Sequence, residues 1–180
     1  MNADTEAIPE DWIERYHYPV YKYCYHMLRH RQEAEDAVQE VFLVAYKQVS
    51  SAAMVHTLSS WLYRIAHNHC LNVVKRKRML RFIPFLSEGW GRGSEEPGYK
   101  GVESNLDIDA LLAVLSPADR SIVILRLVED RPYEEIGVIV NASPAAVRKR
   151  FERAKSKLKR TIVKQEGGAV HESSETVTIL

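Results

Sequence analysis

The sequence predicts an all-α protein of two small helical domains joined by a flexible linker, the C-terminal domain being a helix-turn-helix. Apolar residues recur at helical spacing in several segments, and no segment of useful length alternates as a strand does. Five of the eight glycines lie between Gly89 and Gly101, beside Pro97 and a Ser-Glu-Glu run, which is the composition of a linker. We therefore expect domains at 1–80 and 105–165, a linker at 81–104 and a disordered tail at 166–180.

Three helices are expected in the N-terminal domain. The first, 12–29, is rich in aromatic residues. The second, 32–48, has an apolar stripe that consists of Ala34, Val38, Val41, Phe42 and Ala45. The third, 59–78, begins at two serines that can cap it, Ser59 and Ser60. Its apolar stripe consists of Leu62, Ile65, Ala66 and Val73.

The C-terminal domain is expected to contain helices at 106–115 and 117–128, followed by the helix-turn-helix. The first helix of that motif, 132–140, starts with Pro132, which suits a first helical turn, and with two glutamates that suit the positive end of the helix dipole. A turn follows, in which Ser143 can cap the next helix and Pro144 can take its first position.

The last helix has one apolar edge and a basic outer face. The apolar edge consists of Val147, Phe151, Ala154 and Leu158. The residues opposite it are Ala145, Lys149, Glu152 and Ser156. From Arg148 to Lys164 there are nine basic residues and a single acid. Such a helix can pack on its own domain while it enters a DNA major groove, with Arg148 and Lys149 near the bases and Arg153 near a phosphate.

Charge is sorted along the 180 residues, although the net charge is only +1. A second basic cluster, Lys75 to Arg81, ends the third helix, and acids concentrate in the first forty residues. This layout suits a protein that contacts DNA at two places and a different partner at a third. No run approaches the roughly 20 apolar residues that span a bilayer, and the N-terminus has no apolar signal core. We expect a cytoplasmic protein with no stable membrane insertion.

The sequence contains no pattern typical of catalysis, because it has no Walker loop, GxGxxG, GxSxG or HExxH motif. We therefore expect a protein that is not an enzyme and binds no metal or cofactor. Neither cysteine belongs to a CxxC pair, which disfavours a zinc ribbon. A helical metalloenzyme using His26 and His30 is an alternative, but a metal needs three or four converging ligands, and no second pair is spaced to join them.

Two helix faces carry candidate binding residues. In the second helix, Leu43 stands among acids on the face opposite the apolar stripe, and an exposed leucine there indicates a protein-binding face. In the third helix, polar residues lie near one another across several turns: Arg64, His67, Asn68, Asn72 and Lys75. An asparagine and an arginine beside a basic run can hydrogen-bond base edges and phosphates.

Three segments resemble, in their order, the extracytoplasmic-function group of the sigma-70 family. They are AEDAVQEVFLVAYKQV, WLYRIAHNHCLNVVKRKR and LSPADRSIVILRLVEDRPYEEIGVIVNASPAAVRKRFERAKSKL. The resemblance covers about residues 10–165. These are small bacterial sigma factors that direct RNA polymerase to promoters.

The resemblance implies a promoter-specificity factor that binds core RNA polymerase at its β′ clamp helices and β flap, recognises −35 and −10 elements and helps to melt promoter DNA. It also implies that the protein acts in a stress or envelope response and that an anti-sigma factor controls it. An ordinary helix-turn-helix regulator, with a sensor or dimerisation domain in its N-terminal half, is the alternative binding module. A pull-down of core polymerase distinguishes the two.

The resemblance also assigns residues. Those that would bind polymerase are Glu35, Asp36, Gln39, Glu40 and Leu43. Those that would bind the melted −10 element, together with loop 49–57, are Arg64, His67, Asn68, Asn72, Lys75 and Arg76. Those that would bind the −35 element are Ser143, Ala145, Ala146, Arg148, Lys149 and Arg153.

Overall fold

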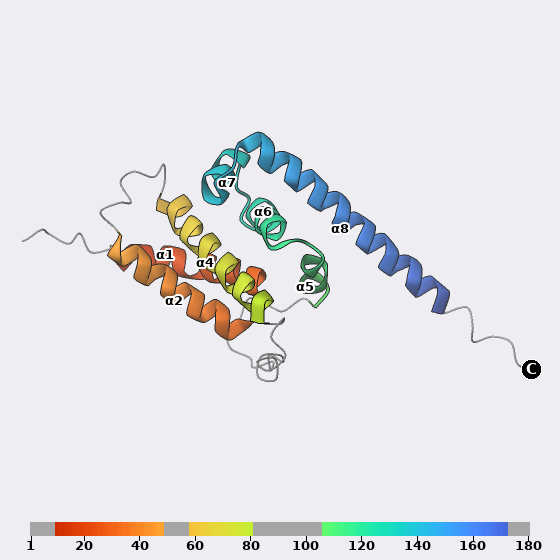
Figure 1. Cartoon of the computed structure of the whole chain (residues 1–180), viewed down its shortest axis with the longest axis horizontal. Helices are drawn as coiled ribbons and strands as arrows, with labels where there is room; N and C mark the ends of the chain where they lie inside the picture. The colour runs from red at the N-terminus through yellow and green to blue at the C-terminus, as the bar shows by residue number, and fades with distance from the viewer. Residues whose placement is uncertain (1–9, 49–57, 81–105, 173–180) are drawn as a thin grey trace, which may run out of the picture.

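The computed structural model describes residues 10–48, 58–80 and 106–172, and all the regular elements in these ranges are α-helices (Figure 1). The N-terminal half is a bundle of α1 (Glu10–Leu28), α2 (Arg31–Lys47) and α4 (Leu58–Leu80), each of which contacts the other two. Its core includes Val20, Met27, Val38, Val41 and Leu62, all at most 1% exposed. The three helices expected from apolar periodicity are therefore confirmed, with bounds that differ by one or two residues.

The C-terminal half consists of α5 (Leu106–Ala113), α6 (Pro117–Leu127), α7 (Tyr133–Val140) and α8 (Pro144–Glu172). Ser116 caps α6, because its Oγ accepts a hydrogen bond from the Asp119 amide at 3.2 Å. The core of this half comes from all four helices and includes Leu112, Ile122, Ile136 and Phe151. The order of helices expected from the sequence is confirmed here too.

Local chemistry explains the tight turn between α7 and α8. Asn141 ends α7 in the left-handed conformation, with φ 54°, which asparagine tolerates better than most residues. Ser143 caps α8 as expected, since its Oγ accepts from the Ala146 amide at 3.3 Å. A Cβ atom on Gly137 would lie 2.6 Å from the carbonyl oxygen of Ala142. The chain can return this closely on α7 only because position 137 has no side chain.

Three local expectations were wrong. The helix α4 begins at Leu58, so Ser59 and Ser60 lie in its first turn and do not cap it. Pro132 is the N-cap residue of α7 and not its first helical residue. The helix α8 continues to Glu172, so residues 166–172 are helical where we expected disorder. The expected linker at 81–104 and the end of the tail, 173–180, lie outside the described residues.

The two halves lie against each other. In Figure 1, α4 runs beside α6 and α7, and contacts between α4 and α7, α1 and α6, and α4 and α6 join the halves. This contact was not foreseen from the sequence, because it joins residues that are far apart in the chain, such as Tyr63 and Glu129.

Candidate nucleic-acid and protein interfaces

The outer face of α2 is open and carries the expected protein-binding residues. Its inner side buries Ala34, Ala37, Val38, Val41 and Ala45. Asp36, Gln39, Glu40 and Leu43 are exposed on the opposite side, Leu43 by 53%. Glu35 differs from them, because it is half-buried and its carboxylate accepts from Arg31 Nε at 2.8 Å. Glu35 therefore pairs within α2, and the other four residues form one continuous surface.

Tyr46 extends this surface and was missed in the sequence. Its side chain is 52% exposed and lies three residues after Leu43, on the same side of the helix. Its spacing of three residues from Leu43 could have indicated it in the sequence. An acidic, part-apolar face of this kind can bind a basic helix that also offers apolar side chains.

One face of α4 is open and polar. Arg64, Asn68, Asn72, Lys75 and Arg76 are all exposed, and their spacing of three and four residues places them along one side of the helix. None of its three basic residues has an ion-pair partner among the residues that the structure describes. Lys77, by contrast, turns back and pairs with Glu33 of α2, which fastens α4 to the bundle. The open face can therefore offer both cations and amide groups to a nucleic acid.

His67 does not share that face. It is 5% exposed, and its Nδ1 lies 2.8 Å from Ser121 Oγ of α6 and 3.3 Å from the Tyr23 hydroxyl. The Tyr23 hydroxyl also lies 2.8 Å from Ser121 Oγ, so the three polar groups form one buried network between the halves. Burial, with a smaller contribution from the Arg150 charge, lowers the pKa of His67 to about 4. His67 is therefore neutral at pH 7 and is covered by the C-terminal half.

A second polar cluster joins the halves around Tyr63. The Tyr63 hydroxyl donates to Glu129 Oε2 at 2.5 Å, and Lys22 Nζ lies 3.3 Å from the other oxygen of that carboxylate. The Arg131 guanidinium lies 4.0 Å from the Tyr63 ring centroid and donates to Ser59 Oγ at 2.6 Å. Burial, and then the neighbouring Glu129 carboxylate, raise the pKa of the Tyr63 hydroxyl well above its ordinary value. Tyr63 therefore stays protonated and holds Glu129 of the opposite half.

The N-terminal part of α8 is open to solvent. All six residues expected to meet the −35 element are exposed: Ser143, Ala145, Ala146, Arg148, Lys149 and Arg153. Val147 and Phe151 are buried on the other side, as the apolar stripe predicted. Arg150 turns back to pair with Asp119 of α6 at 3.0 Å, which ties α8 to its own domain. The exposed −35 residues of α8 are therefore not among the residues described as joining the two halves.

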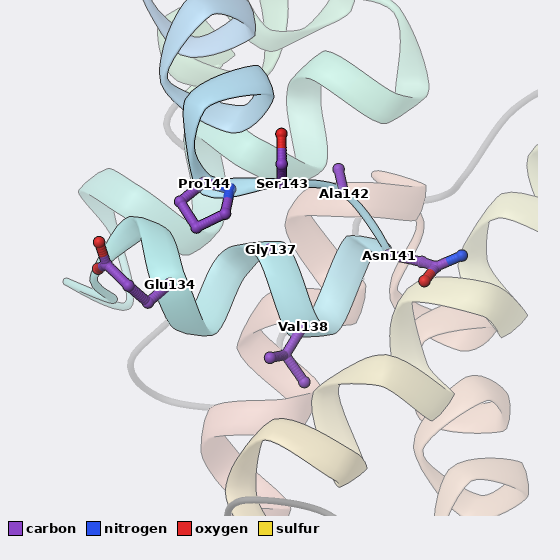
Figure 2. A pocket seen from close by; sticks show the side chains of 7 residues that line it. All are labelled: Glu134, Gly137, Val138, Asn141, Ala142, Ser143 and Pro144. Atoms are coloured by element: carbon purple, nitrogen blue, oxygen red, sulfur yellow. The ribbon is translucent and has the colours of Figure 1, made fainter.

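A shallow hollow lies beside the turn of the helix-turn-helix. Figure 2 shows its lining residues, Glu134, Gly137, Val138, Asn141, Ala142, Ser143 and Pro144. The side chains of Val138 and Ser143 point in opposite directions, and those of Glu134 and Asn141 point outward at the two ends of α7 (Figure 2). Since these groups do not converge, the hollow lacks the arrangement of a small-molecule site.

The structure can be compared with the alternative of a helical metalloenzyme that uses His26 and His30. In the described ranges, no group of three or more His, Cys, Asp or Glu residues is placed to hold a metal. His30 instead caps α2, where its Nδ1 accepts from the Glu33 amide at 3.4 Å. Cys24 and Cys70 are free and buried, and a hydrogen bond with Cys24 raises the pKa of the Cys70 thiol. None of the described helices has the length and apolar character needed to cross a membrane.

Two family models match the chain in the order of its two halves. Sigma-70 region 2 matches residues 12–79, which include nearly all of α1, α2 and α4. Sigma-70, region 4 matches residues 105–158, which include α5, α6, α7 and the first half of α8. The chain belongs to the extracytoplasmic-function group of the sigma-70 family. The resemblance stated from the sequence is thereby confirmed.

Two curated relatives agree with this assignment, and a solved structure shares the fold. The ECF RNA polymerase sigma factor SigE of Mycolicibacterium smegmatis is 31% identical over 169 residues, which are 90% of this chain and 65% of SigE. The ECF RNA polymerase sigma factor SigW of Bacillus subtilis is 27% identical over 171 residues, 89% of this chain and 91% of SigW. The fold matches sigma factor RpoE in its complex with the anti-sigma factor NepR from Bartonella quintana, with a TM-score of 0.69 and 22% identity. That match covers 85% of this chain and 95% of RpoE.

Proposed function

We propose that this sigma factor binds core RNA polymerase, recognises the −35 and −10 elements of its promoters and helps to separate the DNA strands. The observation that carries the proposal is the presence of three separate solvent-exposed faces on α2, α4 and α8. They lie in regions 2 and 4, in the order that the family models give. The chemistry of RNA synthesis then belongs to the polymerase, and this chain acts in the cytoplasm without catalysis of its own.

The α2 face is proposed as the polymerase-binding surface. It combines the exposed carboxylates of Asp36 and Glu40 with Leu43 and Tyr46, which suits a basic helical partner with an apolar edge. On this proposal, residues 1–80 form the polymerase- and −10-binding domain and residues 105–165 the −35-binding domain.

The α4 and α8 faces are proposed as the two DNA-binding surfaces. On α4, Asn68 and Arg64 would hold an unpaired base and its backbone, and the basic end of the helix would follow the strand. On α8, Lys149 would read base edges in the major groove, with Ala145 and Ala146 allowing close approach. Loop 49–57, which we expect to contribute to −10 recognition, lies outside the described residues.

We also propose regulation by an anti-sigma factor. RpoE of Bartonella quintana, whose fold this chain shares, was solved in complex with the anti-sigma factor NepR. A partner that binds across both halves of this chain would stabilise the contact between them and keep His67 covered.

Charge reversal on α2 tests the central step. Asp36→Lys with Glu40→Lys should weaken binding to core polymerase at least about tenfold, because two attractive contacts become repulsive. The free energy of unfolding should change by no more than about 0.5 kcal/mol, since both residues are exposed. Affinity is measured by titrating labelled chain with purified core enzyme, and unfolding by urea.

Glu14→Lys with Asp11→Lys is the matched control, because it makes the same charge change at exposed positions of α1. Unchanged affinity in the α2 variant, or an equal loss in the control, would show that α2 is not the docking face. Failure of the wild-type chain to bind core polymerase, with specific binding to duplex DNA alone, would favour an ordinary regulator instead.

A further inference from the structure

A histidine is buried where the two halves meet. His67 of α4 is 5% exposed, and its Nδ1 lies 2.8 Å from the Oγ of Ser121, which is fully buried in α6. The Tyr23 hydroxyl of α1 lies 3.3 Å from the same nitrogen and 2.8 Å from Ser121 Oγ. Because Ser121 belongs to the C-terminal half, this network exists only while the halves are in contact. Separation of the halves would return the imidazole to water.

The groups around His67 disfavour a proton on its ring in this closed arrangement. From α8, Arg150 places a positive charge near the imidazole, and its pair with Asp119 of α6 at 3.0 Å offsets part of that charge. From α1, the Tyr23 hydroxyl is neutral, because burial raises its pKa well above the ordinary value. On α4 itself, a hydrogen bond with another thiol raises the pKa of Cys70. An imidazolium at position 67 would therefore lose its hydration and meet a like charge.

The free energy of closing the two halves therefore depends on pH. The pKa of His67 is about 4 in the closed arrangement, and the ordinary value of 6.5 should return once the ring is in water. The open arrangement then binds more protons between these values, so closing is fully favoured above pH 6.5 and is progressively weakened as the pH falls. The ratio of open to closed chains should rise about threefold from pH 7 to pH 6, and about eightfold from pH 7 to pH 5.5.

We propose that His67 is a pH-sensitive switch, through which mild acid separates the two halves and exposes a positively charged imidazole next to Arg64 and Asn68 on the open face of α4. A cation at that place would add to the attraction for a single DNA strand. The inference rests on the proposed function only for this last step, because the opening itself is a property of the chain without polymerase or DNA.

The test follows the separation of the halves in the full-length chain by single-molecule Förster resonance energy transfer. Dyes are attached at Gln32→Cys and Ala113→Cys, since both positions are exposed. The two native cysteines are buried, so the introduced thiols should react first. The ratio of molecules with low transfer to molecules with high transfer should rise about threefold when the pH is lowered from 7 to 6.

The dye positions report on the contact because they follow two helix ends that one side chain brings together. Arg120 of α6 donates to the carbonyl oxygen of Met27 at 2.9 Å and to that of Leu112 at 3.1 Å. The end of α1 and the end of α5 are therefore close in the closed arrangement, and opening should move them apart.

Two variants assign the response to one residue. His67→Gln keeps a hydrogen-bonding side chain that does not titrate, so its ratio of open to closed molecules should stay constant within about 1.5-fold from pH 7 to pH 6. His69→Gln is the matched control, because it makes the same change at a half-buried position of the same helix. The charges that act on His69, those of Glu40 and Arg76, both belong to the N-terminal half. This variant should keep the threefold rise.

A titration of the wild-type chain needs no substitution that could disturb folding. In the chain with ¹³C-labelled histidine, the nuclear magnetic resonance signal of His67 should titrate well below pH 6.5. It should shift towards 6.5 in Arg131→Ala, which loses the contacts of Arg131 with Ser59 and Tyr63 across the halves. A signal that titrates near 6.5 while the wild-type halves remain in contact would overturn the proposal.

Two other results would also overturn it. One is a wild-type ratio of open to closed molecules that does not change between pH 7 and pH 6. The other is a rise of equal size in His67→Gln, because another group would then be responsible. Failure of the proposed function looks different, since the chain would open in acid as expected while the assembled polymerase selects no promoter.

Discussion

The helices α4 and α8 are both basic and both expected to meet DNA, but they differ in what covers them. The side of α8 that we expect to face DNA is exposed along its first turns, and the Arg150–Asp119 pair ties α8 to its own half. The open face of α4 lies next to a face that is buried against α6 and α7 through His67 and Tyr63. A basic helix therefore does not by itself define a DNA surface, because the fold decides which of its polar residues remain available.

This difference has a consequence for how the two elements are used. The α8 surface can contact duplex DNA in the arrangement seen here, without any movement. Arg64 and Asn68 are also available, but a contact of DNA with His67 requires that the two halves separate and that the buried network breaks. The assignment of His67 to −10 recognition therefore stays a prediction that depends on such an opening.

The largest effect is expected from breaking the contact between the halves. Arg131→Ala removes the hydrogen bond to Ser59, the pair with Glu135 and the stacking on Tyr63. The free energy of unfolding should fall by about 2–4 kcal/mol, because Glu129 is left in a half-buried site with less compensating charge. Urea unfolding measures the loss, and small-angle X-ray scattering should show a larger radius of gyration.

Arg153→Ala is the control for that variant, because Arg153 is exposed on α8. It should change stability by no more than about 0.5 kcal/mol. The importance of the Arg131 cluster would be refuted by an Arg131→Ala protein that unfolds and scatters as the wild type does.

The next effect is a dependence of stability on pH that comes from His67. Its pKa is about 4 in the folded chain, below the ordinary value of 6.5. The unfolded chain therefore binds more protons between these values, and stability falls as the pH drops from about 6.5 towards 4. The loss at pH 4.5 relative to pH 7 should be about 2–3 kcal/mol.

His67→Gln isolates this term, because glutamine can hydrogen-bond but does not titrate. Acidic residues also titrate near the lower end of the range, so the informative quantity is the difference between the two proteins. Parallel curves of unfolding free energy against pH for wild type and variant would exclude His67 as the group responsible.

A smaller effect is expected at the open face of α8. Lys149→Ala should change the preferred base at one −35 position by about 1–3 kcal/mol of discrimination, since a lost base contact relaxes specificity there. Arg153→Ala should instead lower affinity for all sequences about equally. Selection from a randomised −35 library with assembled polymerase measures the base preference and the affinity of each variant. Identical base preferences in the wild type, Lys149→Ala and Arg153→Ala would mean that α8 is only a basic anchor.

The smallest effect is expected at the open face of α4. Asn68→Ala should make the free energy of open-complex formation about 1 kcal/mol less favourable, which is the contribution of a typical hydrogen bond. A pre-melted template should restore part of the loss. Permanganate reactivity of the −10 thymines measures the melted bubble. Gln32→Ala on α2 serves as the control, and a bubble of wild-type extent in Asn68→Ala would remove this residue from strand capture.

Much of the fold followed from the sequence, because helices and turns depend on interactions over a few residues. The apolar stripes of α2 and α8 indicated which sides are buried, and Ser143 indicated where α8 begins. The errors at Ser59 and Pro132 concern the ends of helices, where one residue of shift costs little energy. Residues 166–172 are helical where we expected disorder. Extending an existing helix adds about one hydrogen bond for each residue that it orders, so α8 can continue beyond its apolar stripe.

The sequence by itself determined the helices, the helix-turn-helix and the three polar faces, since each depends on side-chain spacing along one helix. Only the tertiary structure decided that His67 is covered, because its partners Ser121 and Tyr23 are 54 and 44 residues away in sequence. It also decided that the guanidinium groups of Arg148 and Arg126 each lie over the Tyr133 ring. Such contacts depend on how helices are placed relative to one another, and that placement follows from burial shared across the whole chain and not from any single segment.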